Sequence, residues 1–265
     1  MERIVVLIAF MLFVAGAKSQ EFALEQLEES PRHHEWVKVK SGDREVYCFV
    51  AFPEISTKAT VAIVIHENRG LTDWVRSFSD QLAAQGYIAV APDMLSDFSS
   101  EYHRTSDFAS SDDARNAIYE LDPGQVENDL NVVRSYAAEM EAANGKTVAI
   151  GFCWGGSQSF RFATYNDQLD AALVFYGSAP ESESAIEKIK APVYGFYGGN
   201  DSRINSGIPV TEKMMGEAGK TYKYEIYEGA GHAYMRQGDD PDGAEDNKNA
   251  RNKSWDRIKA ILSEI

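Results

Sequence analysis

Residues 147–156 read TVAIGFCWGG, and this stretch decides the fold. Its first part, Thr147–Phe152, is predicted as a strand. A helix is predicted over Ser157–Tyr165, directly after the glycines that surround Cys153. A nucleophile between glycines at a strand–turn–helix junction is typical of a nucleophile elbow, here with cysteine where serine is commoner.

Strand and helix patterns alternate on both sides of this stretch. Further strands are predicted at Glu35–Val39, Glu45–Pro53, Thr60–His66, Tyr87–Ala91, Ala171–Tyr176, Val193–Tyr197 and Lys223–Tyr227. Further helices are predicted at 74–85, 114–121, 125–143 and 248–265, with a polar surface excursion over 97–124. Such alternation predicts an α/β fold with a mostly parallel twisted sheet and helices on both faces. The site of such a sheet forms beyond the carboxyl ends of its strands.

Length and charge limit the classes of function. The chain has 265 residues, 44% of them hydrophobic, which suffices for one packed domain, expected over residues 20–265. Its net charge of -15 argues against nucleic acid as a partner, because phosphate binding needs clustered Lys and Arg. We expect a monomer that acts on a small molecule.

The first 19 residues form a separate unit. Arg3 precedes an uncharged, mostly apolar run over Ile4–Gly16, and Ala17-Lys18-Ser19 fits the small-x-small pattern before a cleavage point. This pattern predicts a signal peptide at residues 1–19 and an exported protein, periplasmic or secreted, without a membrane partner after cleavage. An uncleaved anchor or a buried first strand are the alternatives, although the run is short for a membrane span.

The two cysteines allow two interpretations. Cys153 at the start of a helix would have its thiolate favoured by the helix N-terminus, as a nucleophile requires. An exported chain with two cysteines can instead form a disulfide, here Cys48–Cys153. No CxxC pair or Cys/His cluster with metal-ligand spacing occurs in the sequence, so we expect neither a metal nor a cofactor.

An acid and a histidine follow later strands in glycine-rich turns. Asp201 closes Gly198-Gly199-Asn200-Asp201, and His232 closes Gly229-Ala230-Gly231-His232. The order of nucleophile, acid and histidine along the chain is that of α/β-hydrolases. We therefore predict a triad in which His232 is the base for Cys153 and Asp201 fixes the tautomer of the imidazole.

The stretch His66-Glu67-Asn68-Arg69-Gly70 follows another predicted buried strand. A backbone amide at this place completes the oxyanion hole of many hydrolases, and the amide of Trp154 points to the same centre. Glu67 has two readings. It keeps the resting thiol neutral, because a carboxylate disfavours a nearby thiolate, or it pairs with Arg69 or another arginine and shapes the loop.

These motifs together resemble the dienelactone hydrolase family of α/β-hydrolases over roughly residues 44 to 263. The matching stretches are 66–71, 86–93, 151–156, 198–201 and 229–232. The resemblance implies the triad predicted above and an oxyanion hole built from the amides of Asn68 and Trp154. It also implies that Glu67 interacts with the cysteine before substrate arrives, and that Arg236 holds a substrate carboxylate.

One position departs from the family. A second carboxylate-binding arginine is expected after the Pro-Asp turn, but Asp97 stands there, with His103 and Arg104 as nearby substitutes. We therefore predict a hydrolase that cleaves an ester or lactone through an acyl-enzyme, with dienelactone itself in doubt. A general carboxylesterase or thioesterase for neutral acyl substrates is the alternative, and a non-catalytic binding protein on the same fold is the third reading.

Overall fold

The computed structural model describes residues 18–265, with side chains from residue 21 onward. Its strands form one eight-stranded sheet in the order β1-β2-β4-β3-β5-β6-β7-β8. The pairs from β4 to β8 are parallel, whereas β1–β2 and β2–β4 are antiparallel. The strands are β1 (His34–Ser41), β2 (Arg44–Ala51), β3 (Ala59–Ile65), β4 (Ile88–Pro92), β5 (Ala143–Phe152), β6 (Ala171–Phe175), β7 (Val193–Gly198) and β8 (Tyr222–Tyr227).

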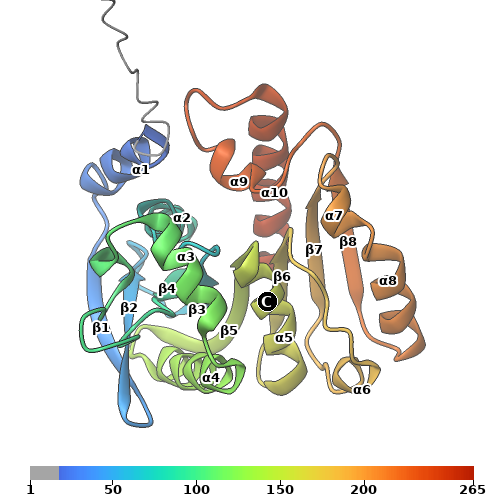
Figure 1. Cartoon of the computed structure of the whole chain (residues 1–265), viewed down its shortest axis with the longest axis horizontal. Coiled ribbons are helices and arrows are strands. Elements are labelled where there is room, and N and C mark those ends of the chain that lie inside the picture. Colours follow the sequence, from blue (N-terminus) through green and yellow to red (C-terminus); the bar gives the residue numbers. More distant parts are fainter. Residues whose placement is uncertain (1–17) are drawn as a thin grey trace, which may run out of the picture.

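Helices connect the strands and cover both faces of the sheet (Figure 1). They are α1 (Lys18–Glu28), α2 (Asp73–Ala84), η1 (Thr105–Asp107), α3 (Ser111–Glu120), α4 (Pro123–Glu139), α5 (Trp154–Tyr165), α6 (Glu183–Ile186), α7 (Ser202–Asn205), α8 (Ile208–Glu217), α9 (Tyr234–Gln237) and α10 (Glu245–Ser263). Residues of α1, α2 and α10 pack into one apolar cluster on one face. Those of α4, α5, α6 and α8 pack on the other.

The central strands lie between these two layers. Every residue of β3, β4 and β6 is buried, as expected for parallel strands covered on both faces. The mostly parallel α/β sheet predicted from the sequence is thus confirmed. The loops that follow β3, β5, β7 and β8 meet at the carboxyl edge of the sheet, so chemical groups distant in sequence come together there.

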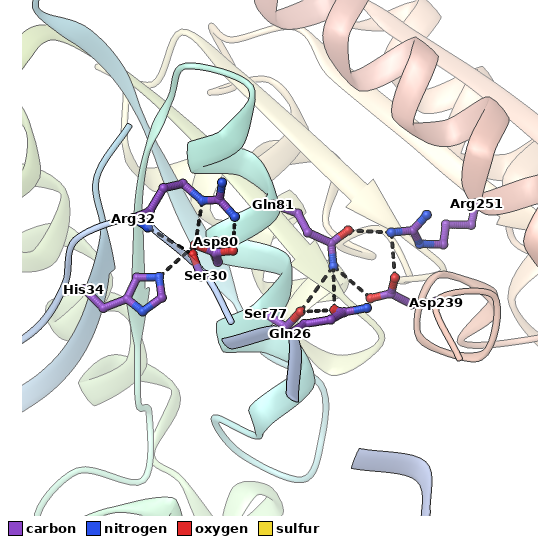
Figure 2. A network of polar contacts seen from close by, with 9 residues as sticks. All are labelled: Gln26, Ser30, Arg32, His34, Ser77, Asp80, Gln81, Asp239 and Arg251. Carbon is purple, nitrogen blue, oxygen red and sulfur yellow. Dashed lines mark hydrogen bonds and ion pairs between the residues drawn. The ribbon is translucent and has the colours of Figure 1, made fainter. Parts of the chain in front are cut away.

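A polar network attaches the N-terminal segment to this body (Figure 2). Asp80 of α2 is 3% exposed and accepts hydrogen bonds of 2.7 Å from the hydroxyl of Ser30 and from Arg32 Nε. His34 Nε2 lies 2.7 Å from the same carboxylate. Apolar contacts add to these bonds, since Ala23 and Leu27 of α1 are buried in the cluster that covers α2.

A second group in Figure 2 joins α2 to the C-terminal helices. Gln81 donates to Asp239, which follows α9, across 2.9 Å, and Arg251 of α10 lies 2.6 Å from the same carboxylate. Gln26 of α1 accepts hydrogen bonds from Gln81 and from Ser77 of α2. The face of the sheet that carries α2 is therefore covered by helices from both ends of the chain.

Two of the longer helices, α1 and α8, escaped the sequence analysis. The predicted leader at residues 1–19 lies outside the described residues except for Lys18 and Ser19, which begin α1. Both that leader and the domain boundary at residue 20 stay predictions. Within the described part of the chain, none of the helices combines the length and the apolar character that a membrane span needs.

Candidate active site

The turn between β5 and α5 raises Cys153 above the sheet. Its backbone has φ 55° and ψ −113°, a region that side-chain-bearing residues rarely occupy. The turn is crowded: a Cβ on Gly151 would lie 1.9 Å from the carbonyl oxygen of Gly155, and one on Gly155 would lie 2.3 Å from that of His66. Glycine at these positions lets the strand reverse sharply into the helix. The elbow predicted from the sequence therefore has the expected geometry.

The other two predicted triad residues reach this thiol from neighbouring loops. His232 lies between β8 and α9, and its Nε2 is 3.1 Å from Cys153 Sγ. Asp201 follows β7, is 6% exposed, and places Oδ2 2.5 Å from His232 Nδ1. The three side chains form one continuous hydrogen-bonded chain. Such an arrangement permits proton transfer from the thiol to the imidazole while the carboxylate fixes the tautomer.

Two backbone amides face the sulfur. Hydrogen bonds from the N–H groups of Trp154 and Asn68 favour the thiolate of Cys153 and lower its pKa. Trp154 opens α5, whereas Asn68 belongs to the loop after β3. Two donors that converge on the nucleophile can also hold the oxygen of a tetrahedral intermediate.

His66 fixes the loop that carries one of these amides. Its Nδ1 lies 2.7 Å from the carbonyl oxygen of Glu67, and its Nε2 accepts from the backbone N–H of Met94 across 3.1 Å. These contacts require a neutral ring with the proton on Nδ1. Complete burial lowers the pKa of His66, in agreement with that form. His66 thus positions the loop.

The surroundings of the resting thiol disfavour its ionised form. Burial, and after it the charge of Glu67, raise the pKa of Cys153 to about 11, although the two amides and the charge of Arg203 act in the opposite direction. A thiol with this pKa attacks a carbonyl only if a base removes its proton during the reaction. His232 is placed for that transfer.

Glu67 and Arg236 form an ion pair beside the thiol. Arg236 Nε donates to Glu67 Oε2 across 2.8 Å, and the Glu67 side chain is 9% exposed. This charge raises the pKa of Arg236. The structure thus joins both readings of Glu67: it pairs with an arginine, and its charge opposes the thiolate. The partner is Arg236, because Arg69 instead contacts Ser111 and Asp112.

A pocket of about 430 Å³ opens above Cys153. Six of the seven predicted site residues line it, and Asp201 lies behind His232 outside the lining. Seven further residues to which the sequence analysis assigned no role at the site also line it: Tyr119, Ser157, Tyr176, Ser178, Arg203, Ile204 and Ala233. Tyr176 packs edge-on against His232, with ring centroids 5.0 Å apart. Arg203 lies two residues beyond Asp201 in the same turn. That proximity was the one signal in the sequence that could have pointed to it.

The two substitutes considered for the missing second arginine lie elsewhere. His103 Nδ1 is 2.8 Å from Asp97 Oδ1, so these two residues pair with each other. The Arg104 guanidinium stacks over the Trp36 ring at 5.5 Å from its centroid. Neither side chain lines the pocket above Cys153. The positive charges at that pocket come instead from Arg69, Arg203 and Arg236.

The disulfide alternative is wrong in this structure. Cys48 is buried in β2, and both it and Cys153 are free thiols. Within residues 18–265, no group of three or more His, Cys, Asp or Glu side chains could hold a metal ion.

Comparison with known proteins places this site in a family. The model of the dienelactone hydrolase family matches residues 46–265. The chain belongs to the dienelactone hydrolase family. A relative from Saccharolobus solfataricus, named "Putative carboxymethylenebutenolidase", is 30% identical over 261 residues, which cover 85% of this chain and 96% of the relative. The predicted family and the prediction of a hydrolase are thereby confirmed.

Solved structures agree on the fold of this dienelactone hydrolase family member. A "Putative Dienelactone Hydrolase" from Klebsiella pneumoniae superposes with a TM-score of 0.77 at 23% identity, over 88% of this chain and 99% of that one. A dienelactone hydrolase-like promiscuous phosphotriesterase from metagenomic libraries gives 0.75 at 22% identity, over 88% and 98%. At such identities the likeness concerns the fold alone.

Proposed function

We propose that the protein hydrolyses carboxylic esters or lactones through an acyl-enzyme on Cys153. One observation carries the proposal: an unbroken hydrogen-bonded chain runs from Asp201 through His232 to Cys153, and its last two residues line a pocket of about 430 Å³. The relative named above as a carboxymethylenebutenolidase supports the same class of bond.

Acylation follows from the contacts of the thiol. His232 Nε2 takes the thiol proton as Sγ attacks the carbonyl carbon, and the carbonyl π electrons move to its oxygen. The amides of Asn68 and Trp154 hold that oxygen, because they already face the sulfur. Collapse of the intermediate breaks the carbon–oxygen bond, and the imidazolium returns its proton to the departing alkoxide. A thioester on Cys153 remains.

Deacylation uses the same groups in the opposite sense. Water attacks the thioester carbon while His232 accepts its proton, and the thiolate leaves and is reprotonated. For a lactone the alcohol stays attached to the acyl chain, so a single hydroxy acid is the product. Asp201 keeps the imidazolium oriented in both halves of the reaction.

We further propose that Glu67 restrains the thiol between turnovers and that Arg236 holds an acidic group of the substrate. The ion pair of 2.8 Å between them supports the first role, because it places a carboxylate beside the sulfur. In the second role, Arg236 must release the carboxylate of Glu67 and bind the acidic group of the substrate in its place. A general esterase acting on neutral acyl groups is the competing candidate, since Asp97 occupies the place of the second arginine.

The first test is hydrolysis by the Cys153→Ala variant. A panel of lactones, aryl esters and thioesters is assayed with wild type and variant, because the panel also separates the two candidate substrate classes. Loss of the nucleophile lowers the rate by several orders of magnitude, about 10⁴-fold or more. Retention of more than about a tenth of the wild-type rate contradicts the assignment of Cys153. Equal far-UV circular dichroism of the two proteins shows that the fold is kept.

We also make proposals about the location, the partners and the oligomeric state of the protein. The N-terminal pattern supports export, to the periplasm or the medium, and the acidic surface supports a small-molecule substrate over nucleic acid or membrane. We propose that it acts as a monomer. Light scattering of the purified chain, with sequencing of the N-terminus after expression in an exporting host, tests both points.

A further inference from the structure

A second cavity adjoins the catalytic pocket. Its volume is about 370 Å³, and its walls are the loop after β6 together with α7 and α8. Ser178, Arg203 and Ile204 line both cavities, so the two are continuous at these residues. Ile208 and Met214 contribute apolar wall to the second cavity. A substrate bound at Cys153 thus has room to extend past Arg203.

Arg203 is an exposed cation without a partner. Among the described residues, no ion pair or hydrogen bond is formed by its guanidinium. The other two arginines of the catalytic pocket differ: Arg236 is held by Glu67 at 2.8 Å, and Arg69 lies near Asp112. Yet Arg203 is close enough to the nucleophile for its charge to favour the thiolate of Cys153.

We propose that Arg203 binds a carboxylate of the substrate at the junction of the two cavities. The apolar part that carries the carboxylate lies in the second cavity. A guanidinium matches a carboxylate with two parallel hydrogen bonds, and a free one needs no ion pair to be broken first. The substrate class is an ester or lactone with an acidic substituent on an apolar chain. This substrate class rests on the proposed function. The attraction of anions toward Cys153 by Arg203 does not depend on that function.

Arg203 and Arg236 differ in what binding requires of each. If Arg236 binds a carboxylate, Glu67 loses its partner, and its buried charge is left uncompensated. Glu181 is the acidic residue that lines the second cavity, and Arg203 forms no pair with it. Although the chain has a net charge of -15, an unpaired arginine attracts anions to its own surroundings. We therefore expect Arg203 to contribute most to the preference for acidic ligands.

The test compares two alkylating reagents on Cys153 in the full chain. Iodoacetate carries a carboxylate and iodoacetamide is its neutral isostere; in both cases Sγ forms a bond to carbon and iodide leaves. Rates are measured by peptide mass spectrometry at mildly alkaline pH and low ionic strength. Both reagents need the thiolate, so a change in its population cancels in the ratio of the two rates. The ratio therefore reports attraction of the anion alone.

Three variants sharpen the comparison. Arg203→Gln is expected to lower the iodoacetate-to-iodoacetamide ratio by about three- to tenfold, and Arg203→Lys to keep most of it. Lys213→Gln removes the same charge from α8 outside the cavity lining and is expected to leave the ratio unchanged. Added salt lowers the wild-type ratio toward that of Arg203→Gln. An unchanged ratio in Arg203→Gln, or an equal fall in Lys213→Gln, overturns the proposal.

Hydrolysis of a matched pair of esters separates this inference from the proposed function. A half-ester with a free carboxylate and its methylated analogue are compared in wild type and Arg203→Gln. A selective rise in KM for the acidic ester extends the anion site to substrates. If wild type hydrolyses neither ester, the proposed function is in question, yet the alkylation ratio still decides the role of Arg203.

Discussion

Among residues 21–265, two buried aspartates each contact a histidine, and the two pairs lie in different settings. Asp201 contacts His232 at 2.5 Å, and the opposite nitrogen of that ring reaches a thiol in an open pocket. Asp80 contacts His34 at 2.7 Å, but it also binds Arg32 and Ser30, and none of these residues lines the pocket above Cys153 (Figure 2). The acid–histidine pair is common to both regions. The strained elbow beside His232 makes one pair a candidate catalytic site, whereas the fully bonded carboxylate of Asp80 attaches the N-terminal segment and β1 to α2.

The largest effect expected from this contrast is on rate. We predict that Asp201→Asn lowers the rate of ester hydrolysis by about 10³- to 10⁴-fold, because the amide no longer holds the catalytic tautomer of His232. The matched variant Asp80→Asn should keep the rate within about twofold, since it lies outside the pocket. Initial rates at saturating substrate measure both. A similar loss in the two variants would mean that the Asp80 region also serves catalysis.

The second expected effect is on stability. Asp80→Ala leaves Arg32 without its partner, and we predict a loss of about 2–3 kcal/mol in the free energy of unfolding, below the range for fully buried pairs because Arg32 is partly exposed. Urea unfolding measures the loss. Asp201→Asn serves as the comparison and should unfold close to wild type. Full stability of Asp80→Ala would show that the network in Figure 2 is not needed to hold the N-terminal segment.

The comparison of wild type with Asp80→Ala also predicts how the stability of the protein depends on pH. Hydrogen bonds from Arg32, His34 and Ser30 hold the pKa of Asp80 below its usual value despite burial. The stability that Asp80 contributes is therefore fully present above the unfolded pKa of about 3.9, and it is lost as pH falls through the lower folded pKa. Wild type should thus lose more stability than Asp80→Ala between neutral pH and strongly acidic conditions. Parallel acid-unfolding curves would contradict this linkage.

The smallest effect concerns the thiol itself. Glu67→Gln removes a negative charge beside Cys153 and releases Arg236, so we predict that the thiol pKa falls below its wild-type value of about 11. Iodoacetamide should then alkylate Cys153 about three- to tenfold faster near neutral pH. The rate against pH gives the pKa directly. Glu35→Gln, at a half-buried position of β1 that does not line the pocket, is the control. A slower reaction in Glu67→Gln would show that the carboxylate does not restrain the thiol.

The sequence predicted the parts of this site that backbone topology sets. Cys153, Asp201 and His232 each follow a strand in a glycine-rich turn, and parallel strands bring such turns to one edge. Side-chain partners were harder to foresee. Arg104 stacks on Trp36 instead of entering the pocket, and Arg203 lines it from α7, a helix of four residues. Periodicity cannot reveal so short a helix, nor can it tell which of several nearby carboxylates an arginine will choose.

The crowded elbow also bears on how such an enzyme can change its specificity by mutation. Any side chain at Gly151 or Gly155 would collide with backbone atoms within 2.5 Å, and backbone cannot move aside as a flexible side chain can. A randomised gene library should therefore recover glycine at both codons in every active clone. The part of the second cavity's wall formed by α7 and α8 carries no such restriction, and Val210 there is 59% exposed. Mutations that change the substrate preference should therefore occur in α7 and α8, while the reaction at the elbow stays the same.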